Sequence, residues 1–174
     1  MRLFLEKGYD ATTVEEIAAA AGVSHMTFFR YFPTKEAAAL AEDYDPVIRE
    51  LIARRPADEP AIEKLQHALT EGLTRMYVTD RAALLARMRL VLCTPALRAG
   101  SWERRYQDQQ LLELALAEHP GHSADALHTR VVVAASMAAA ATAIRIWAEN
   151  NGTRDLPELI NQCFVALREQ LQPT

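Results

Sequence analysis

Hydrophobic positions recur every three or four residues along most of this chain, which is the spacing of one face of an α-helix. The clearest example is near the C-terminus, where one apolar stripe consists of Leu156, Leu159, Ile160, Cys163, Phe164, Leu167 and Leu171. The apolar–polar alternation that is typical of half-buried strands is scarce. The pattern therefore predicts an all-α fold.

Short helices with clear start and stop signals are predicted in the first 40 residues. Residues 1–7 read as the end of a helix that Gly8 terminates. Thr13 and Glu16 have the spacing of a capping box, which predicts a helix from there to Gly22.

The next two helices also have N-cap residues in front of them. Ser24 is a good N-cap for a helix that ends near Pro33. A further helix is expected after Thr34, and it carries Leu40, Tyr44, Val47, Ile48 and Leu51. Beyond the linker-like residues 54–60, amphipathic helices are predicted over about 62–77, 81–94, 98–118, 123–150 and 155–172.

Residues 13–33 meet the requirements of a helix-turn-helix, in which two short helices cross at a steep angle. Ala18 is small where the second helix passes close to it, and Gly22 supplies a positive φ in the turn. The wedge between the helices is filled by Ile17, Ala21, Val23 and Phe28.

The second of these helices has one face left over for binding. Phe28 and Phe32, four residues apart, are expected to point into the core. The opposite side carries His25, Met26, Phe29 and Arg30. Such a face can enter the major groove of DNA. Core packing of the aromatic run and solvated charges are the alternative, which the joint register with Ala18 and Gly22 disfavours.

The segment "GYDATTVEEIAAAAGVSHMTFFRYFPTKEAAAL", residues 8–40, closely resembles the DNA-binding domain of the TetR family. The resemblance implies a cytoplasmic transcriptional repressor that binds a palindromic double-stranded operator as a homodimer and is released by a small-molecule effector. It implies a helix-turn-helix domain at 1–45 and a helical ligand-binding and dimerisation domain at 46–174. In this family the first helix is longer and follows a basic arm, so the first helix is expected to be truncated here.

The resemblance also implies which residues contact DNA: Thr13, Ser24, His25, Met26, Thr27, Phe29, Arg30, Tyr31 and Lys35. Tyr31 and Lys35 match positions that hold phosphate, and Thr13 starts the supporting helix. Phe29 stands where the family usually has tyrosine. We therefore expect an apolar contact there, for example with a thymine methyl group, instead of a hydrogen bond.

The charge of the chain gives DNA binding little general support. The formal net charge is −4, and the first 44 residues hold four basic against seven acidic residues. DNA affinity must then come from the local placement of charge. A helical interaction or ligand-binding module that has lost DNA binding remains an alternative.

The two C-terminal helices are predicted to form a dimer interface. Residues 131–143 are rich in Val, Ala, Ser and Met, which permit close helix packing, and the apolar stripe of 155–172 needs a partner. Pairing both helices with their symmetry mates gives a four-helix bundle. The alternative is that both are satisfied within one subunit.

The three helices over 62–77, 81–94 and 98–118 are expected to enclose an effector cavity. Its predicted walls are Met76, Tyr77, Met88, Leu92, Trp102, Tyr106, Met137 and Trp147, with ordinary core packing as the alternative for each. Residues 86–110 also resemble a TetR branch with an acyl-CoA-like ligand. The arginines that would meet an anionic head group are Arg87, Arg89, Arg98, Arg104 and Arg105, with a solvated face as the alternative.

Other classes of function find little support in the sequence. The sequence shows no phosphate-binding loop or catalytic triad motif, and His119, His122 and His128 beside Asp125 match no metal-ligand spacing. We therefore expect no enzyme, metal or cofactor. The two cysteines are predicted to be buried free thiols in a reducing cytosol. The apolar run 131–144 is short for a membrane span, so no membrane partner is expected.

Overall fold

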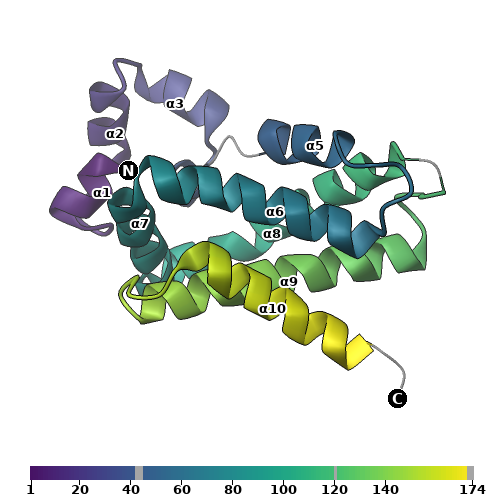
Figure 1. Ribbon diagram of the computed structural model, residues 1–174. Helices are drawn as coiled ribbons and strands as arrows, with labels where there is room; N and C mark the ends of the chain where they lie inside the picture. The colour runs from purple at the N-terminus through teal and green to yellow at the C-terminus, as the bar shows by residue number, and fades with distance from the viewer. Residues whose placement is uncertain (42–44, 120, 172–174) are drawn as a thin grey trace.

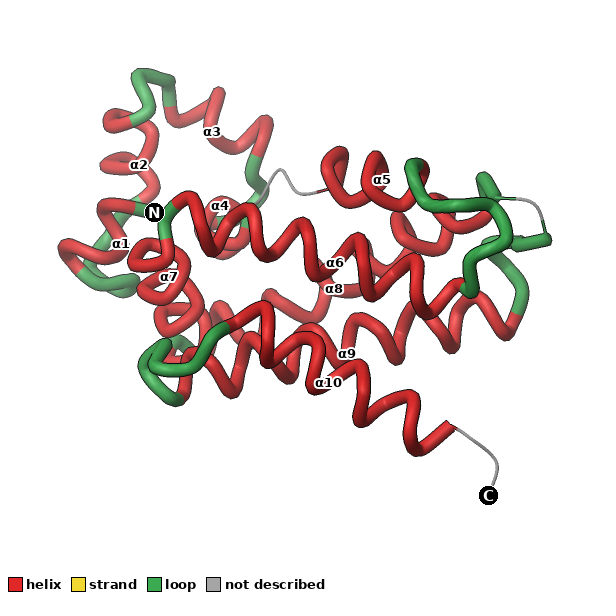
Figure 2. Tube along the Cα trace, viewed as in Figure 1, coloured by secondary structure: helices red, strands yellow, loops and turns green. Residues whose placement is uncertain are grey.

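The computed structural model describes residues 1–41, 45–119 and 121–171, and these residues form helices and loops without a strand (Figures 1 and 2). The helices are α1 (Arg2–Lys7), α2 (Val14–Ala20), α3 (His25–Tyr31), α4 (Lys35–Leu40), α5 (Asp45–Ala53), α6 (Ala61–Thr79), α7 (Arg81–Cys93), α8 (Pro95–Ala117), α9 (Leu127–Glu149) and α10 (Leu156–Leu171). The predicted all-α fold is confirmed.

The short helices of the N-terminal part begin after the predicted N-cap residues, whose side chains accept backbone amides. The Thr13 hydroxyl accepts from the Glu16 amide at 3.2 Å, and the Glu16 carboxylate accepts from the Thr13 amide at 3.1 Å, which completes the capping box. Ser24 caps α3 and Thr34 caps α4 in the same way, each accepting one amide at 3.1 Å. Gly8 and Gly22 both have positive φ, as the turns require.

The predicted single helix beyond Thr34 is wrong, because the structure divides it into α4 and α5. α4 ends at Leu40, and Ala41 is extended with ψ of 128°. Tyr44, which the sequence placed on that helix, lies outside the described residues.

A small core joins the N-terminal helices to the rest of the chain. The Phe4 and Tyr9 rings stack with centroids 5.5 Å apart, and Leu97 of α8 is fully buried in the same cluster. The Arg87 guanidinium of α7 donates to the carbonyls of Ala39 and Ala41 at 3.4 and 3.2 Å. α7 and α8 therefore hold the end of α4.

The C-terminal part is a helical bundle in which α6, α9 and α10 run lengthwise and α7 lies at the end nearest α1 (Figure 1). One core cluster centres on Ile52, Leu65 and Leu116, where α5, α6, α8 and α9 meet. A second centres on Trp147 and Phe164, where α9 and α10 pack against α6 and α7.

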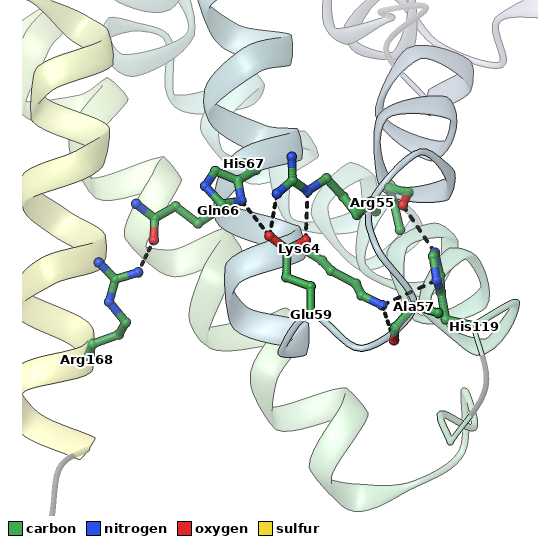
Figure 3. Close-up of polar contacts among 9 residues, drawn as sticks. Arg55, Ala57, Glu59, Lys64, Gln66, His67, His119 and Arg168 are labelled. Carbon is green, nitrogen blue, oxygen red and sulfur yellow. Dashed lines mark hydrogen bonds and ion pairs between the residues drawn. The ribbon is translucent and has the colours of Figure 1, made fainter.

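A buried polar cluster ties together the end of the bundle farthest from α1 (Figure 3). The Lys64 ammonium, 0% exposed, donates to the Ala57 carbonyl at 2.9 Å and lies 3.3 Å from His119 Nδ1. His119 Nε2 lies 3.1 Å from the Ile52 carbonyl. Because an ammonium only donates, the neutral Nε2–H tautomer of His119 satisfies both contacts. His119 is thus a core residue, and the nearby Asp125 pairs with Arg130.

One expectation about the cysteines needs correction. Cys93 is exposed and Cys163 is partly buried, so the expectation that both free thiols are buried is wrong for Cys93.

α9 is long and apolar enough, by length and composition, to span a membrane, with a mean hydropathy of 1.7. It packs against α6, α7, α8 and α10.

Candidate DNA interface and effector cavity

The outer face of α3 is open to solvent. His25, Met26, Phe29 and Arg30 are exposed, whereas Phe28 on the inner face is 3% exposed. α3 lies away from the bundle at one end of the molecule (Figure 1). The face that the periodicity predicts to be free is therefore free in the structure.

Neighbouring side chains hold the Phe29 ring in place. The His25 ring meets it edge to face with centroids 4.7 Å apart, and the Phe28 ring does so at 5.3 Å. His25 Nε2 lies 3.5 Å from a Glu15 carboxylate oxygen of α2. The outer face of α3 thus presents a fixed aromatic ring with apolar and imidazole neighbours.

Lys35 has a structural role that the sequence did not reveal. Its ammonium donates to the carbonyls of Tyr9 and Thr12 at 2.9 and 3.0 Å and lies 4.2 Å from the centroid of the Tyr9 ring. These contacts use two of its three donors. Lys35 fixes the turn between α1 and α2, and its contact with phosphate stays a prediction.

Tyr9 also holds the first turn of α4. Its phenol donates to the Glu36 carboxylate, and this hydrogen bond holds the pKa of Glu36 below its usual range. Burial, followed by the Glu36 contact, raises the pKa of Tyr9. The ends of α1, α2 and α4 are therefore joined by polar contacts around a single tyrosine.

A cavity of about 420 Å³ lies between α5, α6, α8 and α9. Its apolar wall consists of Ile48, Leu69, Gly72, Leu73, Met76, Leu111, Leu112, Ala115, Met137, Ala140, Ala141 and Ile144. Gly72 lets α5 approach closely, because a Cβ there would lie 2.3 Å from Ile48 Cδ1. The cavity is large enough for a small apolar ligand or chain.

Charged side chains gather on the α5 and α8 sides of this cavity. Arg49 of α5 pairs with Glu118, and Arg104 pairs with Asp108 at 2.7 Å. Arg105 is exposed and stacks over the Trp102 ring at 5.2 Å. An anionic group entering here would meet three guanidinium groups and would compete with two carboxylates for them.

The structure brings only part of the predicted effector site to this cavity. Met76, Met137, Arg104 and Arg105 line it. The other predicted wall and arginine positions do not: Tyr77, Arg87, Met88, Arg89, Leu92, Arg98, Trp102, Tyr106 and Trp147.

These residues lie away from the cavity for different reasons. Trp147 is 0% exposed in the core with Tyr77 against it, whereas Trp102 and Tyr106 are 73% and 58% exposed. Arg87 binds carbonyls at the end of α4. Helical periodicity shows which residues form an apolar face, but it does not show which helix packs against each of them.

Sequence reasoning missed Gly72, Arg49 and Asp108 as cavity residues. Gly72 carried a usable signal, because glycine inside an amphipathic helix costs about 1 kcal/mol relative to alanine and so indicates a packing requirement. Arg49 and Asp108 had none. Among the described residues no group of three or more His, Cys, Asp or Glu side chains is arranged to hold a metal ion.

Comparisons with known proteins agree with this architecture. Residues 1–41 match the profile of bacterial regulatory proteins of the tetR family, and residues 59–172 match the MftR C-terminal domain. TcmR, an HTH-type transcriptional regulator of Streptomyces glaucescens, is 33% identical over 99% of this chain and 79% of its own. MftR of Mycobacterium tuberculosis is 25% identical over 94% of this chain and 83% of its own.

A solved structure is also similar over the full length. Thermus thermophilus FadR, a TetR-family transcriptional repressor in complex with lauroyl-CoA, superposes with a TM-score of 0.62 at 26% identity, covering 100% of this chain and 92% of that one. The fold and the exposed face of α3 together define a helix-turn-helix regulator with a helical C-terminal domain. The chain belongs to the TetR family of transcriptional regulators, which are not enzymes.

Proposed function

We propose that the protein is a cytoplasmic repressor that binds a palindromic operator as a homodimer and is released by an amphipathic effector. The effector places an apolar part in the cavity and an anionic end at its arginines. The observation that best supports this proposal is the path of helix α8, which connects the cavity to α4. Its C-terminal half lines the cavity, and near its start Gly100 packs against Leu40 and Glu36 of α4.

An exposed apolar stripe on α9 supports the homodimer. The large side chains Leu127 and Val131 are 78% and 56% exposed, and Ala134 and Ala138 continue the stripe with small side chains. On α10, Val165 is 42% exposed. Small and apolar residues on adjacent helices favour a four-helix interface between two copies. Changing Val131 and Ala138 together to glutamate should give monomers in light scattering and weaken operator binding.

The composition of the cavity supports an amphipathic effector. Its interior is apolar, whereas Arg49, Arg104 and Arg105 lie at its α5 and α8 sides. A similar fold holds lauroyl-CoA in FadR, a ligand with an apolar chain and an anionic end. Acyl-CoA-like molecules are therefore the first class of effector to test.

Release follows from differential binding to two states. A ligand that binds better to a bundle with shifted α5 and α8 draws the protein toward that state. Because α8 touches α4, and α4 holds Tyr9 through Glu36, such a shift reaches the helix-turn-helix. Two recognition helices held about 34–36 Å apart, one turn of DNA, then lose their spacing.

Operator binding is tested first by fluorescence anisotropy near physiological salt. The probes are a duplex from the gene's own upstream region and a scrambled duplex of the same composition. A preference of about 10³-fold or more is expected for a specific operator. Equal, weak binding to this duplex and to tiled neighbouring duplexes would instead favour a helical module without a DNA-binding role.

Effector release is tested by adding acyl-CoAs of increasing chain length to the protein–operator complex. Arg105→Gln should weaken the response to them about tenfold or more, because a charge-assisted contact of about 1.5–3 kcal/mol is lost. Arg89→Gln is the matched control, because Arg89 is exposed and does not line the cavity. No release and no thermal stabilisation by any chain length would contradict this class of effector.

A further inference from the structure

α3 carries few of the side chains that read base edges by hydrogen bonds. The helix reads HMTFFRY and contains no Asn, Gln, Asp, Glu or Lys, the residues that together with Arg read base edges by hydrogen bonds. The Thr27 hydroxyl accepts from Ser24 Oγ at 3.0 Å, and His25 lies beside Glu15. The Arg30 guanidinium stacks on Tyr31 at 5.2 Å.

Two apolar side chains are left as prominent features of the outer face. Met26 is 84% exposed and Phe29 is 42% exposed. They are three residues apart, so they are neighbours on the helix surface. The Phe29 ring is already held between His25 and Phe28, which reduces the entropy lost when it packs against a ligand.

An apolar helix face in the major groove can pack against one apolar group of the bases. The C5-methyl group of thymine is the apolar feature of the four base pairs on that side, and no other unmodified base carries one. The N-terminal part also has a negative balance of charge, with four basic and seven acidic residues among the first 44. Contacts to bases must therefore contribute more here than in a strongly basic domain.

We propose that α3 recognises C5-methyl groups, with Met26 and Phe29 packing against methyl groups at neighbouring positions of each operator half-site. 5-Methylcytosine carries the same methyl group at the corresponding ring position. A methylated cytosine in place of such a thymine is therefore a second ligand of the same surface. This inference rests on the proposed entry of α3 into the major groove.

The test uses the full chain and duplexes that it selects from a randomised pool. Each thymine of the selected operator is replaced singly by deoxyuridine, which removes the methyl group and keeps the hydrogen-bonding pattern. At the positions facing Met26 and Phe29 we expect about fourfold weaker binding per methyl group. The same replacement in both half-sites should weaken binding about 15-fold.

Met26→Ala identifies which position the methionine reads. In this variant the penalty for deoxyuridine should disappear at one position and persist at its neighbour. Met26 is so exposed that the change should leave the fold intact. Val78→Ala on α6 is the matched control, because Val78 is apolar and 75% exposed but far along the chain from α3, and all penalties should persist.

A methylation series separates the methyl group from the rest of the base. A sensitive thymine–adenine pair is replaced by cytosine–guanine and then by 5-methylcytosine–guanine. The methylated duplex should bind about fourfold better than the unmethylated one, and Met26→Ala or Phe29→Ala should remove that gain.

The possible failures are distinguishable. If the protein prefers its selected duplex to a scrambled one but tolerates deoxyuridine at every position, the recognition of methyl groups is wrong and operator binding stands. If selection returns no preferred duplex, operator binding itself is wrong and the present inference fails with it.

Discussion

The short helices α2, α3 and α4 of the N-terminal part and the three longest helices of the bundle are stabilised in different ways. α2, α3 and α4 have only six or seven residues each, and each begins with a side chain that accepts a backbone amide. α6, α8 and α9 have 19 to 23 residues and no side-chain cap at their first turn. Helices this short are unstable without local help, whereas long amphipathic helices are stabilised by the surface they bury.

The difference bears on function. The capped helices form a small unit that is buried on its inner side and leaves the outer face of α3 exposed. The packed helices leave a cavity where side chains do not fill the space between α5, α6, α8 and α9. We therefore expect the bundle to shift when that space is occupied and the capped helix-turn-helix to move with α4 as a unit.

The largest effect is expected from removing packing in the bundle. Trp147→Ala should lower the free energy of unfolding by about 3–5 kcal/mol, because a fully buried indole is lost. Urea unfolding at a fixed protein concentration measures this. Trp102→Ala is the matched control and should change stability by less than about 0.5 kcal/mol, because Trp102 is exposed. Equal effects of the two changes would contradict the assignment of Trp147 to the core.

Lys35 tests whether the capped unit also depends on longer-range contacts. Lys35→Ala should destabilise the N-terminal helices by about 2 kcal/mol, because two hydrogen bonds from a charged group to carbonyls are lost. Binding to all DNA sequences should weaken. If Lys35 also contacts phosphate, the slope of log K against log salt should fall by about one. An unchanged slope would leave Lys35 with a positioning role alone, and unchanged affinity would contradict both roles.

The sequence predicted the capped unit well because its signals are local. Thr13 and Glu16, three residues apart, interact directly, and Ser24 caps the helix it precedes. In each case both partners lie within one helical turn of each other in the sequence. The break between α4 and α5 was missed, because the apolar spacing continues across it.

The cavity could be predicted only in part because its walls come from four helices. Met76 and Met137 were identified by residue type, whereas Trp147 and Trp102, chosen by the same reasoning, do not line this cavity. Helical periodicity predicts on which face of its helix a residue lies, but it does not predict which residues of other helices contact it. Lys35 shows the same limit, since its carbonyl partners lie 23 and 26 residues earlier.

The capping box gives the next prediction. Thr13→Ala should cost about 1 kcal/mol of stability and weaken operator binding by a similar amount, because α2 supports α3. Thermal unfolding and anisotropy on the same preparation measure the two effects. Thr13→Ser is the matched control and should retain both, since serine caps equally well. A loss for both variants would mean that the threonine methyl group, and not the cap, is what matters.

The smallest effect concerns pH and the contact between Tyr9 and Glu36. The hydrogen bond from Tyr9 lowers the pKa of Glu36 in the folded protein, so the carboxylate contributes stability above the unfolded pKa of about 4.3. That contribution is lost as pH falls through the lower, folded pKa. Tyr9→Phe should return the pKa of Glu36 toward its usual range, which NMR titration of the side-chain carboxyl can follow. The stability of this variant should then depend less on pH below about 4.3 than that of the unchanged protein. An identical pH dependence would show that Tyr9 does not set the ionisation of Glu36, and that the capped helices are joined without it.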